Sequence, residues 1–352
     1  MTQSHVAIIS PCKGRYGGME AFALAVAAAI DKDSTFSVEV VFKMVSSFSL
    51  HDDLREMVRA SGLRVSFCKR FSWQLWRIIR RADLIHLQNL SPDVALMTRL
   101  AAKPLLATIH VRNHEKSIFR QRLLKATLNL PHQRFYISNF VRKSWEQTEQ
   151  PWPCSRVVHS VCELSTLSPL PIEQRRGFVF VSRWIDNKGL DILVEAYAQS
   201  GLDPDLWPLK LLGDGPLRPK IIARLNDLGI RDKVKTPGFL SPVDKAEYIR
   251  HSRFAVIPPN LGEDFGLVPL EARHLGLPCL ITLDGGVPES AGSHSLSCEP
   301  GDIEGLKSLL CQAAEMTEEN YRVLSTAAHE SLDSEIVRPK AYVAFYAEML
   351  GA

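Results

Sequence analysis

Short apolar runs alternate with amphipathic stretches along almost the whole chain. A continuous apolar run is typical of a strand buried on both faces, and apolar positions at helical spacing are typical of a helix packed on one side. The predicted strands cover residues 6–10, 37–44, 63–68, 84–88, 105–110, 134–138, 156–160, 178–182, 209–212, 234–236, 254–257 and 279–282. The predicted helices between and after them include 21–30, 51–61, 71–81, 93–101, 117–129, 190–199, 220–228, 245–251, 304–315, 321–331 and 336–350.

This alternation predicts an α/β protein built from parallel, doubly wound sheets. It is interrupted once, at residues 164–176 (LSTLSPLPIEQRR), where prolines stand in a stretch without periodicity. We therefore expect two Rossmann-like domains, residues 1–165 and 177–335, joined by a linker at 166–176 and separated by an inter-domain cleft. Residues 336–352 are predicted to form a C-terminal helix that packs back on the first domain.

The stretch from Asn260 to Glu289 carries the strongest candidate chemistry. It reads as strand end, loop, helix and strand, with Glu263 in the loop and Glu271 in the first turn of the helix. The free N–H groups at a helix start attract anions. A phosphorylated ligand on residues 265–268, with one carboxylate on each side for sugar hydroxyls, is one interpretation. The other interpretation is that Glu271 only interacts with the helix dipole and that Glu263 is a solvated acid of the loop.

Two features of the first half also suit a ligand site. Gly17 and Gly18 lie in a loop between a predicted strand and a helix, where backbone can approach a phosphate, although a tight turn explains them equally well. His110 stands at the carboxyl end of a buried strand, where ligands collect in parallel sheets. A lone histidine at such a position is either functional or structural.

Composition and charge narrow the class of protein. The 352 residues are 45% hydrophobic and 23% charged, as in ordinary globular proteins, and no apolar stretch has transmembrane length. The seven cysteines are scattered without a CxxC pair, and the first residues lack a secretory signal pattern, so we expect a reducing, cytoplasmic location and no zinc site.

The net charge of +3 is unevenly distributed. Residues 1–165 hold 23 Lys and Arg against 13 Asp and Glu, a net of +10, and the remaining residues hold 19 against 26, a net of −7. A basic first half suggests an anionic partner. No recognised nucleic-acid motif accompanies the charge, so we expect no nucleic-acid partner.

A basic, aromatic stretch at residues 71–81 suggests where that partner is met. Trp73 and Trp76 alternate there with Arg77, Arg80 and Arg81. Such a helix can lie on an anionic bilayer surface. A helix packed on the sheet with a solvated arginine edge is the simpler interpretation, so contact with the inner face of a membrane stays an alternative.

Several motifs, in order and at consistent spacing, resemble those of the retaining glycosyltransferases of family 4, which have the GT-B fold. The matching segments are Gly17-Gly18-Met19-Glu20, Thr108-Ile109-His110, Ser182-Arg183 with Lys188-Gly189, Gly213-Asp214-Gly215-Pro216, Gly238-Phe239-Leu240, Glu263 to Glu271 and Gly285-Gly286-Val287-Pro288-Glu289. The most specific is the E-x7-E pattern of Glu263 and Glu271. The resemblance spans nearly the whole chain.

The resemblance implies transfer of a hexose, with its anomeric configuration kept, from a nucleotide-diphosphate sugar to a glycan, lipid-linked or small-molecule acceptor. The first domain would serve the acceptor and the second the donor. Arg183 and Lys188 would neutralise the departing diphosphate, Glu263 would hold a sugar hydroxyl, and His110 would contact the donor sugar. The implied donor-binding residues are Gly17, Gly18, Gly215, Phe239, Phe265, Gly266, Leu267, Val268 and Glu271, with Glu271 on the ribose.

Acceptor binding is assigned only to Glu20 and Arg112, because the sequence departs from the family on that side. His110 is followed by Val111, where relatives often carry Asp, and residues 159–162 replace the family's Asn-Gly-Val-Asp. The resemblance implies no cofactor and no metal. Asp203-Pro204-Asp205 spells the manganese motif of another glycosyltransferase fold, but it stands between prolines in a predicted surface turn.

Two other functions remain open from the sequence. A nucleotide-sugar epimerase of the same fold would act on the donor alone, without an acceptor. A catalytically inactive nucleotide-sugar-binding protein would keep the binding residues without turnover. The presence together of Arg183, Lys188, Glu263 and Glu271 favours the transferase.

Overall fold

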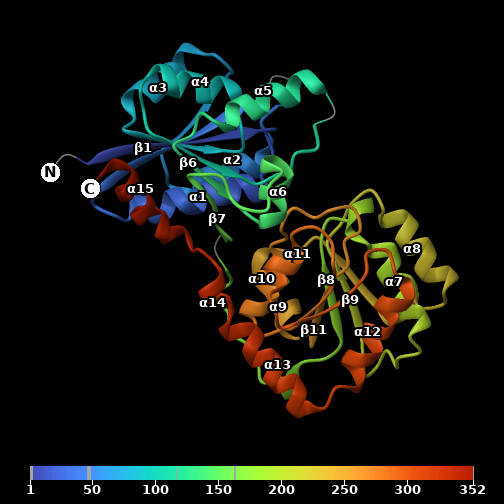
Figure 1. Ribbon diagram of the computed structural model, residues 1–352. Coiled ribbons are helices and arrows are strands. Elements are labelled where there is room, and N and C mark those ends of the chain that lie inside the picture. Colours follow the sequence, from blue (N-terminus) through green and yellow to red (C-terminus); the bar gives the residue numbers. More distant parts are fainter. Residues whose placement is uncertain (1–2, 46–48, 116, 162–163, 352) are drawn as a thin grey trace. The chain divides into compact units, whose positions relative to one another are not determined.

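The computed structural model describes residues 3–45, 49–115, 117–161 and 164–351, and the chain divides into two compact units (Figure 1). Unit 1 consists of Met1–Glu163 together with Val337–Ala352, and unit 2 of Leu164–Ile336. Each unit is built on one sheet in which the described pairings are parallel. The predicted fold class, an α/β protein with two doubly wound, Rossmann-like domains, is confirmed.

The sheet of unit 1 has the strand order β3-β2-β1-β4-β5-β6-β7. Its strands are β1 (Ser4–Cys12), β2 (Phe36–Met44), β3 (Val65–Cys68), β4 (Leu84–Gln88), β5 (Leu105–Ile109), β6 (Gln133–Tyr136) and β7 (Ser155–Val157). The central strands are apolar on both faces, because helices cover the sheet on both sides. The order changes direction between β1 and β4, the position at which doubly wound sheets bind ligands.

The helices of unit 1 are α1 (Gly18–Asp31), α2 (Asp52–Ser61), α3 (Trp73–Arg81), α4 (Pro92–Leu100), α5 (Ile118–Leu128), α6 (Asn139–Glu146), the short 3-10 helix η4 (Pro339–Ala341) and α15 (Tyr342–Leu350). Side chains of α1 and α15 pack on one face of the sheet with Val6 and Ile8, and α3 and α4 pack on the other with Ala7 and Ile9. The alternation of neighbouring β1 residues between the two cores follows from the period of two in a strand.

The C-terminal segment belongs to unit 1, far in sequence from the rest of that unit. Val337 forms a parallel bridge with Ser160, and α15 then places Tyr342 and Tyr346 fully inside the core. The Tyr342 hydroxyl lies 2.8 Å from the Ser160 hydroxyl, so the buried phenol is satisfied. In Figure 1 this helix, in red, lies beside the blue helix α1 of the same unit.

The sheet of unit 2 has the order β10-β9-β8-β11-β12-β13. Its strands are β8 (Phe178–Val181), β9 (Leu209–Leu212), β10 (Val234–Gly238), β11 (Phe254–Ile257), β12 (Cys279–Thr282) and β13 (Ser295–Cys298). The sequence did not predict β13, because this edge strand is only partly buried and half of its residues are polar. The order changes direction between β8 and β11.

The helices of unit 2 are η1 (Ile172–Gln174), η2 (Asp186–Lys188), α7 (Leu190–Gln199), α8 (Arg218–Asp227), η3 (Arg231–Lys233), α9 (Pro242–Arg250), α10 (Val268–His274), α11 (Val287–Ala291), α12 (Ile303–Glu315), α13 (Glu318–Glu330) and α14 (Leu332–Glu335). Residues 166–176, expected as a linker, pack on this unit. Arg175 is buried there and donates to the backbone of Leu170 and Gly276, which holds the stretch in place. No helix among the described residues is long and apolar enough to cross a membrane.

Candidate functional site

A small cavity lies at the point in unit 2 where the strand order changes direction. It measures about 90 Å³ and is lined by residues at the carboxyl ends of β8 and β11, in η2, in the loop before α10 and at the start of α10, among them Lys188, Glu263 and Gly266 to Val268. Ligands of open parallel sheets bind outside the carboxyl ends of the strands at this position. The structure therefore brings together five of the residues that the sequence predicted for a donor site.

Lys188 and Glu263 form an ion pair through Nζ and Oε2 at this cavity. Lys188 ends the 3-10 helix η2, and Gly189 follows with φ +64°. A Cβ atom at Gly189 would lie 1.8 Å from the carbonyl oxygen of Pro258, so only glycine lets the loop after β8 pass so close to the end of β11. About one fifth of each paired side chain is exposed, so both remain accessible to a ligand.

Asp284 fixes the backbone of the Glu263 loop. Its carboxylate accepts hydrogen bonds from the backbone N–H groups of Gly262 and Glu263, at 2.9 and 2.8 Å. The backbone N–H of Gly286 donates to the carbonyl of Glu263 at 2.8 Å. The turn at residues 284–286 thus holds the loop from which the Glu263 side chain reaches the cavity.

We expect Gly285→Ala to destabilise unit 2 and to disturb the Glu263 loop. Gly285 has φ +58°, and a Cβ atom there would lie 2.0 Å from the carbonyl oxygen of Glu263. Left-handed backbone costs an alanine about 1–2 kcal/mol, and the overlap adds about 1–3 kcal/mol. Chemical denaturation measures the loss of stability. Gly301→Ala is the matched control, since Gly301 also has positive φ but open space around its Cβ position; equal losses for both variants would contradict the role of the close contact.

Glu271 lies in the first turn of α10 and is paired with a residue that the sequence did not indicate. Lys245 of α9 places Nζ 2.7 Å from Oε1 of Glu271. The other oxygen, Oε2, is buried and has no hydrogen-bond partner in the described part of the chain. A buried carboxylate oxygen without a partner is costly, so Glu271 can accept a hydroxyl hydrogen bond from a ligand.

The remaining predicted residues of unit 2 are not among the residues that line the cavity. Arg183 is exposed in the loop after β8, and Gly215 packs its backbone against Trp184. Phe239 follows β10 with 85% of its surface exposed. Phe265 is buried, and its carbonyl accepts a hydrogen bond from the Ser290 hydroxyl at 2.7 Å. The roles of these residues stay predictions.

In unit 1 the glycine-rich loop leads from β1 into α1 as expected. Gly17 is the N-cap residue of α1, and Gly18 is its first residue. Glu20 is buried in the first turn, and burial raises the pKa of its carboxyl group. Burial also raises the pKa of the nearby Cys12 thiol to about 12. Acceptor binding by Glu20 stays a prediction.

His110 is half-buried just beyond the carboxyl end of β5. Its Nε2 atom lies 2.7 Å from the amide oxygen of Gln88, its backbone N–H donates to Asn89 at 2.7 Å, and Phe22 packs edge-on at 5.0 Å. Burial lowers the pKa of His110 to about 4, so the ring is neutral at physiological pH. Arg112 lies two residues on, with its guanidinium 5.8 Å from the centre of the Phe140 ring.

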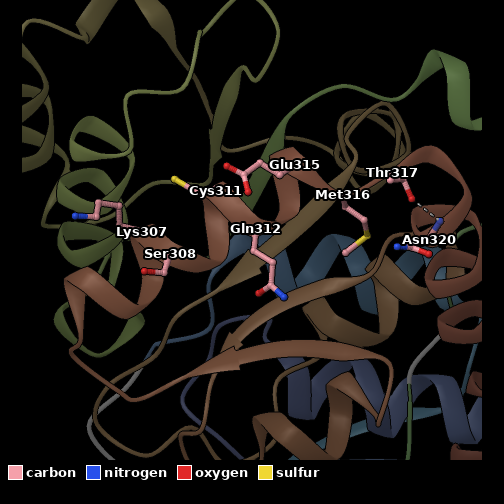
Figure 2. A pocket seen from close by; sticks show the side chains of 8 residues that line it. All are labelled: Lys307, Ser308, Cys311, Gln312, Glu315, Met316, Thr317 and Asn320. Atoms are coloured by element: carbon pink, nitrogen blue, oxygen red, sulfur yellow. Dashed lines mark hydrogen bonds between the residues drawn. The ribbon is translucent and has the colours of Figure 1, made fainter.

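A larger hollow of about 520 Å³ lies elsewhere in unit 2, on α12 and the start of α13 (Figure 2). Its lining includes Cys311, Glu315 and Met316, and the hydrogen bond drawn there is the cap of α13, from the Asn320 backbone N–H to the Thr317 hydroxyl. The residues that line this hollow come from α12, α13 and the turn between them, and none of them is a predicted site residue. We therefore assign the site to the smaller cavity.

Three residues that contact predicted site residues were missed from the sequence. Asp284 and Gln88 had a weak signal, since each is a polar residue at or just after the carboxyl end of an apolar run. Lys245 had none, because a lysine in a polar helix is ordinary surface composition.

Comparison with known families decides the identity of both halves. Residues 16–160 match the family described as Glycosyltransferase Family 4, and residues 168–330 match the family described as Glycosyl transferases group 1. The chain belongs to these glycosyltransferase families. The match to the second family contains Lys188, Glu263 and Glu271, and the match to the first contains Gly17, Gly18 and His110.

Similar proteins agree with this family assignment. The chain is 31% identical over 162 residues to the N-acetyl-alpha-D-glucosaminyl L-malate synthase of Bacillus anthracis, covering 46% of this chain and 41% of that protein. It is 33% identical over 148 residues to a D-inositol 3-phosphate glycosyltransferase of Mycobacterium sp. (strain KMS), covering 38% and 32%. These matches thus span less than half the length of the curated relatives.

Two solved structures share the fold over nearly the whole chain. Alr3699/HepE from Anabaena in complex with UDP has a TM-score of 0.82 at 16% identity, and a glycosyltransferase from Rickettsia africae ESF-5 has 0.81 at 15%. Each comparison covers 99% of both chains. The GT-B fold implied by the sequence resemblance is confirmed.

Proposed function

We propose that the protein is a retaining glycosyltransferase that moves a hexose from a nucleotide-diphosphate sugar to a glycan, lipid-linked or small-molecule acceptor. The observation that carries the proposal is the Lys188–Glu263 pair beside the cavity where the strand order of unit 2 changes direction. A cation for a departing diphosphate and a carboxylate for a sugar hydroxyl are the two groups that donor cleavage needs in one place.

The second unit would bind the donor. Lys188 and Arg183 neutralise the diphosphate as its bond to the sugar breaks, and the backbone around Phe265 to Val268 adds N–H dipoles. Glu263 accepts a hydrogen bond from the donor sugar. Glu271 accepts ribose hydroxyls on Oε2, while the hydrogen bond from Lys245 orients the other oxygen. Phe239 and the backbone of Gly215 border the nucleotide.

The first unit would contribute His110 to the donor sugar and the Gly17–Gly18 loop to the diphosphate, with Glu20 and Arg112 on the acceptor. The configuration is retained because the acceptor attacks from the same face that the diphosphate leaves, and the departing phosphate oxygen takes the proton of the acceptor hydroxyl. No protein nucleophile is required by this route, and the charges of Arg183 and Lys188 replace a metal ion at the diphosphate.

A panel of UDP-, GDP-, ADP- and TDP-linked sugars tests the function directly. We expect one base and sugar to raise the melting temperature, because a ligand that binds only the folded state stabilises it by about 2.7 kcal/mol at a hundred times its Kd. The same donor should then lose its sugar when candidate acceptors are added. Binding without turnover over all acceptors would support the inactive binding protein instead.

The epimerase alternative is separated by incubating the stabilising donor alone. A transferase leaves the donor unchanged apart from slow hydrolysis, and an epimerase converts it to a second nucleotide sugar at the full rate. The family membership favours the first outcome.

The acceptor is proposed to be presented at an anionic membrane surface, with unit 1 in peripheral contact. The apolar face of α3 is buried against the sheet through Leu75, Ile78 and Ile79, as expected for a packed helix. Trp73 is nevertheless 71% exposed. It lies at a hollow that is also lined by Trp76, Arg77, Arg80 and Arg81. On α5, Ile118 and Phe119 are 70% and 78% exposed, next to Arg120 and Arg122. Exposed apolar side chains among arginines match a bilayer surface.

We expect vesicles containing anionic lipid to bind the protein in low salt and to release it in high salt. Each arginine near an anionic surface contributes about 1 kcal/mol, so replacing Arg77, Arg80 and Arg81 together by glutamine should weaken binding by roughly a hundredfold. Flotation of the protein with liposomes measures the bound fraction. Replacement of Lys233, Lys235 and Arg231 of unit 2 is the control for loss of charge alone; a lack of salt-dependent flotation of the unaltered protein would reject the contact.

A further inference from the structure

Four polar side chains of unit 1 form a hydrogen-bonded chain from α15 to His110. The Tyr346 hydroxyl lies 2.6 Å from Nδ1 of His86, Nε2 of His86 lies 3.0 Å from the amide nitrogen of Gln88, and the amide oxygen of Gln88 lies 2.7 Å from Nε2 of His110. Tyr346, His86 and Gln88 have no exposed surface. Polar groups in an apolar core cost stability unless every one is bonded. This series of hydrogen bonds passes through the central strand β4 and ends at His110, the predicted donor-sugar contact.

The direction of each hydrogen bond follows from the orientation of the Gln88 amide, whose oxygen faces His110 and whose nitrogen faces His86. Its amide oxygen can only accept, so His110 carries its proton on Nε2. Its amide nitrogen can only donate, so Nε2 of His86 is an acceptor and Nδ1 of His86 carries the proton, which it donates to Tyr346. Both rings must be neutral for this pattern, and burial lowers the pKa of His86 to about 3 and that of His110 to about 4.

We propose that Gln88, His86 and Tyr346 are positioning residues for glycosyl transfer, which hold His110 in the Nε2–H tautomer and leave its Nδ1 as a hydrogen-bond acceptor for a donor-sugar hydroxyl. This inference rests on the proposed function of His110 as a contact of the donor sugar. As the sugar becomes electron-poor in the transition state, a lone pair accepting from its hydroxyl group adds electron density, whereas an N–H group would withdraw it. The tautomer of His110 is therefore part of the chemistry.

The hydrogen bonds couple Tyr346 to His110 through His86 and Gln88, and this coupling can be tested. In Tyr346→Phe the Nδ1–H group of His86 has lost its acceptor inside the core. His86 is then better satisfied with its proton on Nε2, which a rotated Gln88 amide accepts through its oxygen. The rotated amide turns its nitrogen toward His110, and His110 must move its proton from Nε2 to Nδ1.

Thr108→Val is the matched control for this variant. The Thr108 hydroxyl lies 2.7 Å from Nε2 of His86, so this substitution also removes a buried hydroxyl from His86, but from the nitrogen that already accepts from Gln88. The direction of donation along the hydrogen bonds is unchanged, and His110 keeps its proton on Nε2. A purely structural network would respond to both variants in the same way.

Two-bond hydrogen–nitrogen NMR spectra of the full-length protein labelled with nitrogen-15 histidine show which ring nitrogen is protonated. We expect the Nε2–H form of His110 in the unaltered protein and in Thr108→Val, and the Nδ1–H form in Tyr346→Phe. In turnover of the donor found by the panel, kcat of Tyr346→Phe should fall roughly tenfold, the value of one hydrogen bond, while the Kd of the nucleoside diphosphate alone is unchanged. Gln88→Met, which removes the link itself, should give a mixture of tautomers and the same selective fall in kcat.

An Nδ1–H form of His110 in the unaltered protein would overturn the proposal, and so would a folded Tyr346→Phe or Gln88→Met variant with unchanged tautomer and kcat. The spectra do not require turnover. Absence of turnover with every donor would therefore count against the proposed function, whereas a wrong tautomer beside normal turnover would count against the positioning role only.

Discussion

Lys188→Ala is expected to lower kcat/KM for the donor by a hundredfold or more while leaving the fold intact. The Nζ charge is within reach of the diphosphate in the proposed site, and loss of one group that stabilises transition-state charge costs about 3–4 kcal/mol. Removal of the lysine also leaves the Glu263 carboxylate, which is only about one-fifth exposed, without its cation. Glu263→Ala should cost a similar factor, and the double variant less than the product of the two, because the residues share one interaction. Release of nucleoside diphosphate from the donor measures each rate.

Lys307→Ala is the control for the loss of an ion pair outside the proposed site. Lys307 pairs with Glu304 on α12 and does not line the site cavity, so its replacement should leave kcat/KM unchanged. Near-normal turnover by Lys188→Ala would refute the assignment of the diphosphate to this lysine. Unchanged circular dichroism and melting temperature are required of every variant before its rate is interpreted.

Tyr342→Ala is expected to destabilise unit 1 by about 4 kcal/mol, as for other large aromatic side chains removed from a core. Tyr342 is fully buried, stacks on His86 at 5.3 Å, and packs edge-on against Phe22 and Phe345. Its hydroxyl also satisfies Ser160. Hydrogen exchange measured by mass spectrometry reports the loss region by region, and the amides of β4 and β5 should exchange faster.

Two further variants show whether the effect belongs to this position. Tyr342→Phe removes only the hydroxyl and should cost about 1 kcal/mol. Tyr321→Ala removes an equally buried tyrosine from unit 2 and should accelerate exchange in β8 and β11. Equal acceleration in both units for either alanine variant would mean that the units do not unfold separately, contrary to the division of their cores.

The layered fold was predictable because its signal is local and strong. Short, mostly apolar runs such as Phe254–Ile257 and Leu84–Gln88 indicate buried strands, and the helices between the strands carry clear apolar faces. The edge strand Ser295–Cys298 was missed because half-exposed residues leave no such pattern. The division of the chain into two units depends on pairings far apart in sequence, such as Ser160 with Val337, which periodicity does not encode.

The site was predictable only where backbone constraints appear in the sequence. Glycines and the Glu263–Glu271 spacing marked the loop that the structure places at the cavity. The partners Asp284, Lys245 and Gln88 could not be assigned, because a carboxylate, a lysine or an amide becomes a site residue through its distance to another chain segment. Such distances follow from the packed sheet and not from local sequence.

The placement of α15 in unit 1 has a consequence for the order in which the protein is made. A ribosome releases the N-terminal unit first, and domains generally fold in that order. Here residues 164–336 form a contiguous unit, whereas the core of unit 1 receives Tyr342 and Tyr346 only after all of unit 2 has been synthesised. Unit 2 is therefore expected to reach its native structure first, although it is translated second. Until the last turn of α15 emerges, the apolar face formed by α1 and the sheet stays uncovered and is open to chaperone binding.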